Sequence, residues 1–527
     1  MRTKRLFAFV LCVCILLSCV SCAENVKQNE TDGTDLPVNT EKPTETAPVD
    51  VAPTYQETLT IGINQEPSTV MTPTKGTNAM CQMITRSTHS TLLDLDPETG
   101  EITNDLAEEW SVSPDGTEYT FKIHEGVLFS NGEECTAEDV KFTLEQRVPN
   151  GALAPLVTSI ASVEVVDKYT VKITLTGPLQ DMKYTLAGPP CSIVCKSAVE
   201  AEGDEGEKYG TGAFAIAEYV QGEYVMLQRN EDYFGEKPNT KNLKFAIYLE
   251  DSTRQLALET GEIDVCYSPA NADLVYIQSN DNLKLISVSG VNIYYIGFNT
   301  QAEPFSNEKV RQAIACCVNK EDAITVAFDG YAEVATNVMA PAIPLYQDVS
   351  VWELDVDKAK VLMKEAGYEG GFKATVWVDR ADEEQMAVLF KENLKEIGID
   401  LEVIRLEATT LKAKWKDDDY QMCIQKFGNT GGPDISFSYV FASTASANRS
   451  RINDPYVDQT IAAAAVEKDL DKRSDIYREL NEYITTTAYW VPICIPQVFA
   501  AIKTGLEGAK YSGNTSHDFT YACLPES

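Results

Sequence analysis

Apolar and polar residues alternate between positions 105 and 146 in a way that predicts several short elements in succession. Apolar side chains occupy alternating positions on both sides of the turn Pro114-Asp115-Gly116, at Trp110, Val112, Tyr119, Phe121 and Ile123. This pattern predicts two strands joined by a tight turn, because proline presets φ and glycine tolerates positive φ. Thr136 stands three residues before Asp139 and ahead of an apolar stretch, which predicts a helix start whose acid complements the helix dipole.

Similar reasoning over the rest of the chain predicts a mixture of strands and helices. Strands are predicted at 58–63, 291–299, 373–378 and 400–405, and helices at 254–258, 308–318, 358–366, 383–397 and 471–487. Gly367 directly follows one of these helices and suits its C-terminal cap. The succession of strand, helix and strand at 373–405 predicts a βαβ-like unit.

The first 57 residues differ in composition from the rest of the chain. Basic residues precede an apolar run from Leu6 to Leu17, which is too short for a permanent membrane span and predicts a signal peptide over 1–22. Leu16-Leu17-Ser18-Cys19 fits a bacterial lipobox with Cys19 as the lipidated residue. Cys22 is a second possible lipidation site. The alternative is a secretory signal that is cleaved without lipidation. Residues 23–57 are rich in Thr, Pro, Glu and Asp, which predicts a flexible stalk.

Charge and cysteine content narrow the range of partners. The chain has 44 basic and 80 acidic residues, a formal net charge of −36, which argues against nucleic acid and anionic membrane surfaces as partners. Ten of the fourteen cysteines lie beyond the signal segment, dispersed without CxxC pairs, so a zinc site is not expected. A disulfide between Cys191 and Cys195 is the one pairing that the spacing leaves open.

Histidine is scarce, which argues against several classes of enzyme for this protein. Only His89, His124 and His517 occur, and neither a metalloprotease helix motif nor a nucleophile elbow is present. His124 falls within a strand pattern and His517 within a polar C-terminal stretch, whereas His89 precedes the predicted hairpin. We therefore expect no catalytic residues, no metal site and no cofactor.

Several segments occur in an order that resembles one protein family. These are WSVSPDG…CTAEDV at 110–140, GTGAF at 210–214, NEDYFGEKP at 230–238, GEIDV at 261–265, YYIGFNTQAEPFSNEKVRQAIA at 294–315 and DKAKVLMKEAGY at 357–368. Together they resemble the family 5 extracellular solute-binding proteins of ABC transporters, the peptide and nickel binders. The resemblance runs from about residue 58 to the C-terminus.

The resemblance implies an α/β, two-lobed fold of the periplasmic-binding-protein type (type II, cluster C) with an extra subdomain. Lobe I would comprise residues 58–88, 206–288 and 476–527, the subdomain 89–205, and lobe II 289–475. The chain would cross between the lobes near 289 and 475. Ligand contacts to both lobes would then stabilise a closed form that docks on the permease.

The same resemblance points to candidate ligand-binding residues in lobe II. In peptide-binding relatives, a Trp and an Asp three residues later contact the ligand, and the Asp pairs with its α-amino group. Lys426 and Asn429 stand at these positions here. Asn accepts a hydrogen bond from an ammonium group but supplies no compensating charge, which makes ordinary peptide recognition doubtful. Asp434 is then the fallback partner for a cation, and Phe427 and Thr430 are neighbours expected in the same site.

In lobe I the candidate ligand-binding residues are Met71, Thr72, Thr88 and His89. The resemblance implies a monomeric binding lipoprotein outside the cytoplasm, tethered to the membrane by lipid only, that carries an oligopeptide or another elongated polar solute to ABC permease subunits. A receptor-like protein that signals to a membrane partner and a nickel-chelate binder are the alternatives. A hydrolase on this scaffold is a further alternative with no motif to support it.

Overall fold

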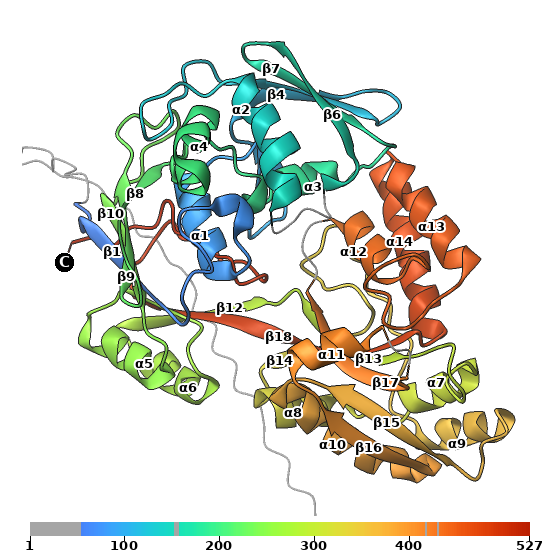
Figure 1. The fold of residues 1–527 in the computed structure, drawn as a ribbon. Helices are drawn as coiled ribbons and strands as arrows, with labels where there is room; N and C mark the ends of the chain where they lie inside the picture. Colours follow the sequence, from blue (N-terminus) through green and yellow to red (C-terminus); the bar gives the residue numbers. More distant parts are fainter. Residues whose placement is uncertain (1–53, 152–156, 417–418, 429–431, 527) are drawn as a thin grey trace, which may run out of the picture. The chain divides into compact units, whose positions relative to one another are not determined.

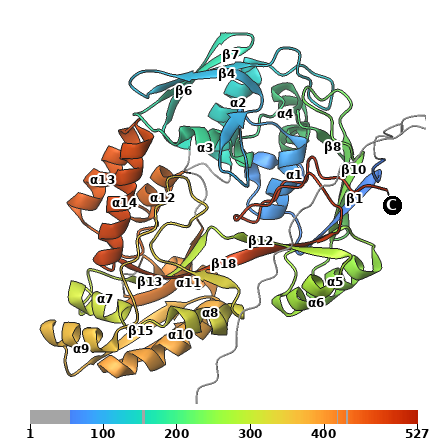
Figure 2. The ribbon, with the colours of Figure 1, turned by 180° about the vertical axis from the view of Figure 1, so that it is seen from behind.

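A computed structural model describes residues 54–151, 157–416, 419–428 and 432–526, and for Ile435 its backbone alone. A long sheet runs through this part of the chain in the strand order β16-β15-β17-β13-β18-β11-β1-β10-β9-β8, and β12 and β14 also pair with β18 (Figures 1 and 2). Parallel and antiparallel pairs are mixed: β1 runs parallel to β10, while β13 runs antiparallel to β17. The predicted α/β class is confirmed.

Lobe I is built around the β1 end of this sheet. Its strands are β1 (Thr58–Ile63), β8 (Phe214–Val220), β9 (Tyr224–Arg229), β10 (Asn242–Ile247), β11 (Val265–Tyr267) and β12 (Leu283–Ser289). Its helices are α1 (Ala79–Thr88), α5 (Asp251–Thr260) and α6 (Leu274–Ser279). Ile61, Phe245 and Leu227 are fully buried on adjacent strands and form the centre of the lobe I core.

The subdomain forms its own core above α1. Its hairpins are β2 (Leu93–Leu95) with β3 (Ile102–Asn104), β4 (Ala107–Val112) with β5 (Glu118–Ile123), and β6 (Ile160–Asp167) with β7 (Thr170–Leu175), and its helices are α2 (Ala137–Phe142), α3 (Met182–Leu186) and α4 (Lys196–Glu202). The predicted hairpin is present, with Trp110 opposite Phe121. Asp139 accepts hydrogen bonds from the backbone N–H (2.9 Å) and the hydroxyl (3.0 Å) of Thr136, as part of a capping box at the start of α2.

Lobe II contains the other half of the sheet and two helical layers. Its strands are β13 (Asn292–Phe298), β14 (Ala332–Val334), β15 (Phe372–Val378), β16 (Ile399–Arg405) and β17 (Met422–Gly428). Its helices are α7 (Glu308–Ala315), α8 (Lys320–Phe328), α9 (Val356–Glu365), α10 (Ala381–Leu394), α11 (Ala408–Lys414), α12 (Pro433–Val440), α13 (Pro455–Val466) and α14 (Leu470–Thr486). The strand–helix–strand unit β15-α10-β16 is parallel, as the sequence predicted.

Two chain segments connect the lobes. The first is Gly290-Val291, between β12 and β13, close to the predicted position at 289. The second lies within β18 (Trp490–Lys503), which pairs with β13 through Cys494 and with β12 from Gln497 onward. This is beyond the predicted boundary at 475, because α14 and Trp490 pack in the same apolar cluster of lobe II. From here on, lobe II includes residues 476–495.

The described residues test only part of the predictions about the N-terminal segment, membrane-spanning helices and the possible disulfide. Cys19, Cys22 and most of the predicted stalk lie outside the described residues. None of the helices in the described part has both the length and the apolar character that a membrane crossing requires. Cys191 and Cys195 are free, buried thiols, as are the other eight cysteines of that part.

The link between α9 and β15 depends on a glycine. Gly371 has φ of +72°, and a Cβ at this position would lie 1.9 Å from the carbonyl oxygen of Gly398. We expect Gly371→Ala to lower the free energy of unfolding by about 2 kcal/mol, because the left-handed conformation and the overlap both disfavour a side chain. Gly370→Ala is the matched control, since a Cβ there meets nothing within 4 Å. Equal urea midpoints for the two variants would contradict this account.

Candidate functional site

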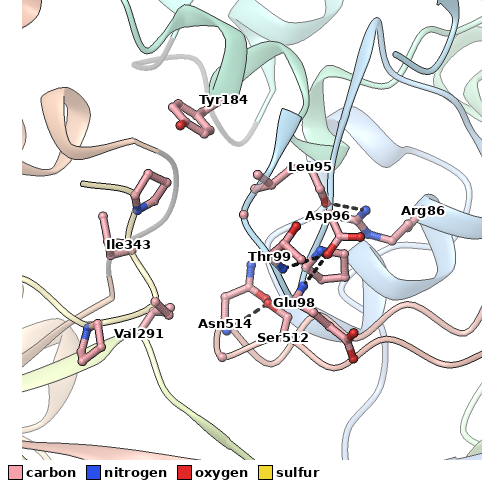
Figure 3. A pocket seen from close by; sticks show the side chains of 16 residues that line it. Arg86, Leu95, Asp96, Glu98, Thr99, Tyr184, Val291, Ile343, Ser512 and Asn514 are labelled. Atoms are coloured by element: carbon pink, nitrogen blue, oxygen red, sulfur yellow. Dashed lines mark hydrogen bonds between the residues drawn. The ribbon is translucent and has the colours of Figure 1, made fainter. Parts of the chain in front are cut away.

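A cavity of about 280 Å³ lies where lobe I, the subdomain and lobe II meet (Figure 3). Its polar lining includes Arg86, Asp96, Tyr184, Ser512 and Asn514, and its apolar lining includes Leu95, Val291, Pro341, Ile343 and Pro344. The lining thus comes from six separate segments of the chain. A cavity that mixes apolar walls with a few converging polar groups suits a small organic solute.

Internal hydrogen bonds hold the subdomain side of the cavity in place. The Arg86 guanidinium donates through Nη1 to Asp94 Oδ1 (2.7 Å) and to the Leu95 carbonyl oxygen (3.3 Å). Asp96 accepts from the backbone N–H groups of Glu98 and Thr99, each at 2.9 Å, and from Lys510 Nζ at 2.8 Å. Although partial burial opposes it, these hydrogen bonds hold the pKa of Asp96 at about 2. The ionised carboxylate therefore fixes the turn between β2 and β3 to the C-terminal loop.

The predicted lobe II residues lie on β17 and at the start of α12. Lys426 is exposed opposite Tyr294 of β13, and its ammonium group has no hydrogen bond or ion pair among the described residues. Desolvation of its ammonium group and, secondarily, the charge of Arg380 lower the pKa of Lys426. Phe427 is half-buried and packs edge-on against Trp490, with ring centroids 6.0 Å apart. Asn429 and Thr430 lie outside the described residues, and neither Lys426 nor Phe427 lines the cavity above.

Asp434 lies in a buried cluster of charges. Its Oδ2 accepts from Arg473 Nη2 (2.5 Å), its Oδ1 accepts from the hydroxyl of Tyr477, and its backbone N–H donates to Asp181 Oδ2 (2.7 Å). Arg473 Nη2 also donates to Asp181 Oδ1 at 2.6 Å. Burial and the Asp434 charge raise the pKa of Asp181 above its usual range. Asp434 thus already has a cationic partner inside the protein, and its ligand role stays a prediction.

The predicted lobe I residues have internal partners too. His89 is 5% exposed, with Nε2 2.8 Å from the Glu207 carbonyl oxygen and Nδ1 2.8 Å from the Thr88 hydroxyl. Burial lowers the pKa of His89 to about 4, so the ring is neutral at pH 7. Met71 and Thr72 are half-buried, and Thr72 Oγ1 is hydrogen-bonded to Thr69 Oγ1 at 2.5 Å. None of the four lines the cavity, and their ligand roles also stay predictions.

Comparison with known proteins gives the family. Residues 101–449 match the model of the bacterial extracellular solute-binding proteins, family 5 Middle, which is more than half of the chain. The chain belongs to this family. The glutathione-binding protein GsiB of Salmonella typhimurium is 29% identical over 474 residues, which cover 86% of this chain and 92% of GsiB.

Solved structures support the same assignment. HbpA2 from Haemophilus parasuis has a TM-score of 0.82 at 25% identity, over 89% of this chain and 100% of that one. DppA from Helicobacter pylori, in complex with the peptide STSA, has a TM-score of 0.74 at 26% identity, over 90% and 99% of the two chains. This family 5 protein is therefore a solute-binding protein of the extracytoplasmic type and not an enzyme. Among its described residues we find no group of three or more His, Cys, Asp or Glu side chains that could hold a metal ion.

Sequence reasoning did not identify the residues that line the cavity of this family 5 protein. Arg86, Tyr184 and Asn514 belong to no motif and lie far apart in the chain. The one local signal was Asp96-Pro97-Glu98-Thr99-Gly100, a sequence typical of a turn in which an aspartate accepts from the following N–H groups. Turn chemistry alone gives no indication that the turn faces a cavity.

Proposed function

We propose that this protein captures an oligopeptide or another elongated polar solute between its lobes and delivers it to the permease of an ABC importer. The observation that carries the proposal is the cavity lined by lobe I, the subdomain and lobe II together. A solute held there would contact all three parts and would favour the closed arrangement over an open one. The glutathione and peptide ligands of GsiB and of DppA from H. pylori support a short peptide as the solute class.

The lipid anchor is part of this proposal. Cys19 follows Leu16-Leu17-Ser18 in the manner of a bacterial lipobox, and Cys22 offers a second register. Attachment at either cysteine would leave a stalk of 35 to 38 residues before the first strand of lobe I. Metabolic labelling with a fatty acid tests this step, and labelling that survives Cys19→Ala but not Cys22→Ala would assign the second register.

A thermal-shift screen tests the proposed solute class. Purified protein is heated with di- to hexapeptides, glutathione, oligosaccharides and nickel chelates, and bound solute raises the apparent Tm by mass action. At one hundred times Kd the stabilisation is about 2.7 kcal/mol, which gives a shift of several degrees or less in a protein of this size. Because Asn429 lacks the charge of an amine-binding Asp, we expect N-acetylated peptides to bind about as well as free ones. Loss of binding on acetylation would contradict this reading of Asn429.

A substitution in the cavity tests whether the solute binds there. Thr99 is exposed and lines the cavity, whereas Thr103 on the same hairpin is exposed and does not. Thr99→Trp would fill part of the space, and we expect it to weaken solute binding at least tenfold. Thr103→Trp is the matched control and should bind as the unmodified protein does. Equal affinities for both variants would place the solute elsewhere.

A further inference from the structure

Asp181 is a fully buried carboxylate of the subdomain whose partners belong to lobe II. It directly precedes α3, and Met182 and Leu186 of that helix pack in the subdomain core. Its Oδ1 accepts from Arg473 Nη2 at 2.6 Å, and its Oδ2 accepts from the Asp434 backbone N–H at 2.7 Å. Both partners lie on lobe II helices, α14 and α12. The carboxylate therefore bridges two parts of the chain that have separate cores.

The charged groups on the lobe II side of this contact are paired with each other without Asp181. Arg473 and Asp434 form an ion pair, Tyr477 donates its hydroxyl to Asp434, and Arg473 Nε donates to the Ala464 carbonyl oxygen at 3.1 Å. The charges of the Arg473–Asp434 pair cancel, so Asp181 adds one surplus negative charge. If the subdomain moved away, the buried pair would remain satisfied and Asp181 would be hydrated by water. Such a contact can form and break without leaving an unpaired buried charge.

The surrounding contacts between the subdomain and lobe II are also polar. Gln180 N–H donates to the Ala465 carbonyl oxygen at 3.3 Å, and Lys468 Nζ donates to the Pro114 carbonyl oxygen at the tip of the β4–β5 hairpin. The two large apolar clusters of the subdomain and lobe II share no residue. Interfaces of this kind between parts of one chain resemble transient protein–protein contacts.

Gly432 makes the close approach of Asp181 to α12 feasible. It is the residue before α12, and a Cβ at this position would lie 2.0 Å from Asp181 Oδ2. Its φ is −81°, which any residue adopts, so the absence of a side chain matters here for space. Any larger residue would push the carboxylate away from the N–H of Asp434.

We propose that Asp181 is a positioning residue of lobe closure, docking reversibly on Arg473 and on the start of α12 to hold that helix against the subdomain. The proposal rests on the proposed function, because closure around a solute is what would bring the subdomain and lobe II together. It assigns a role to a side chain that is not among the residues lining the cavity.

A reversible crosslink tests whether the contact forms and breaks in solution. In Asp181→Cys/Gly432→Cys, the Cβ at 432 would lie 2.2 Å from the site of Asp181 Cγ, so the two cysteines are adjacent and a disulfide forms once the side chain at 181 turns slightly away from that site. We expect diamide to close the crosslink and small-angle scattering to show a smaller radius of gyration than after reduction with dithiothreitol. Each single cysteine variant is a control and should show no change. A crosslink that fails to form, or that forms without any change in radius, would overturn the proposal.

Hydrogen exchange tests the role of the carboxylate itself. The Asp434 N–H is bound to Asp181, so we expect Asp181→Ala to speed its exchange at least tenfold in the full chain. Asp181→Asn retains an oxygen acceptor and should restore most of the protection, which a general loss of packing would not allow. Exchange at the unmodified rate in Asp181→Ala would overturn the positioning role. Neither experiment uses a solute, so failure of the peptide screen and failure of this proposal are distinguishable.

Discussion

Arg311→Met is expected to lower the free energy of unfolding of lobe II by about 3–5 kcal/mol. Arg311 lies on α7, is 3% exposed, and has backbone carbonyl groups as its hydrogen-bond acceptors. Its Nη1 donates to Phe305 (2.8 Å), its Nη2 to Thr487 (2.9 Å), and its Nε to Thr487 and Ala488 (3.2 Å each). Methionine fills similar space but leaves these buried carbonyl groups without donors, at about 1–3 kcal/mol each.

The position of Arg311 at a helix end adds to the expected loss. Thr487 is the C-terminal cap of α14, where the carbonyl groups carry the negative end of the helix dipole. The Arg311 guanidinium also lies 5.2 Å from the ring centroid of Tyr489. Burial lowers the pKa of Arg311, so its desolvation offsets part of the gain, which is why the expected loss stays below the sum of the separate bonds.

Lys309→Met on the same helix is the matched control. Lys309 is exposed and pairs with Glu365 at 2.7 Å, a surface contact that contributes at most about 1 kcal/mol. Urea denaturation, monitored by tryptophan fluorescence, gives the free energy of unfolding of both variants. If the lobes unfold separately, Arg311→Met should lower the urea midpoint of the lobe II transition. Equal midpoints for the two variants would contradict the role assigned to Arg311.

Local pattern predicted some of the elements of this fold but not all of its boundaries. The β4–β5 hairpin and the β15-α10-β16 unit follow from alternation, turn residues and helical spacing, all of which act over a few residues. Gly367 has φ of +83° after α9, as its predicted role as a cap requires. The second lobe boundary was misplaced because α14 could pack in either lobe on pattern alone, and only its contact with the Trp490 cluster decides it.

The candidate site was less predictable because its neighbours are distant in sequence. Asp434 was predicted as the fallback partner for a cationic group of the ligand, and the structure pairs it with Arg473, on another helix. His89 was predicted because it was expected near the cleft, and in the structure Gly210 lies so close that a Cβ there would come within 2.6 Å of the His89 ring. The resemblance to family 5 supplied the architecture, and the contacts of individual side chains could come only from the folded chain.

His517→Gln is expected to remove a pH-dependent part of the stability, and this effect should reach about 3 kcal/mol between pH 7 and pH 4. His517 is 1% exposed within a group of aromatic rings from Tyr267, Tyr511 and Phe519. Its Nδ1 accepts from the Ser512 N–H at 3.1 Å, and its Nε2 has no hydrogen-bond partner among the described residues. A proton on Nδ1 would face another donor, so the folded protein holds this ring in its neutral form.

The sign of the effect follows from the two pKa values. Burial lowers the pKa of His517 to about 4, below the value of about 6.5 in the unfolded chain. The unfolded state therefore binds a proton first as pH falls, and the stability contributed by the neutral ring is complete above pH 6.5 and is lost towards pH 4. Glutamine can keep an acceptor for Ser512 but cannot titrate. The difference in unfolding free energy between the unmodified protein and the variant should thus shrink by about 3 kcal/mol over this range.

The quantity to compare is the difference in unfolding free energy between the unmodified protein and the variant at each pH. The pH dependence of one protein alone is not sufficient, because other buried groups change the stability in the opposite direction. Burial raises the pKa of Asp105 to about 7 and that of Glu383 to about 8, so both favour the folded state as pH falls. Phe519→Leu, beside His517, is the matched control, since it disturbs the same packing without a titrating group. We expect its urea midpoints to be displaced from those of the unmodified protein by a similar amount at every pH. A His517→Gln difference that also stays constant from pH 7 to pH 4 would contradict this prediction, because it would show that the ring takes up its proton at the same pH in the folded and unfolded protein.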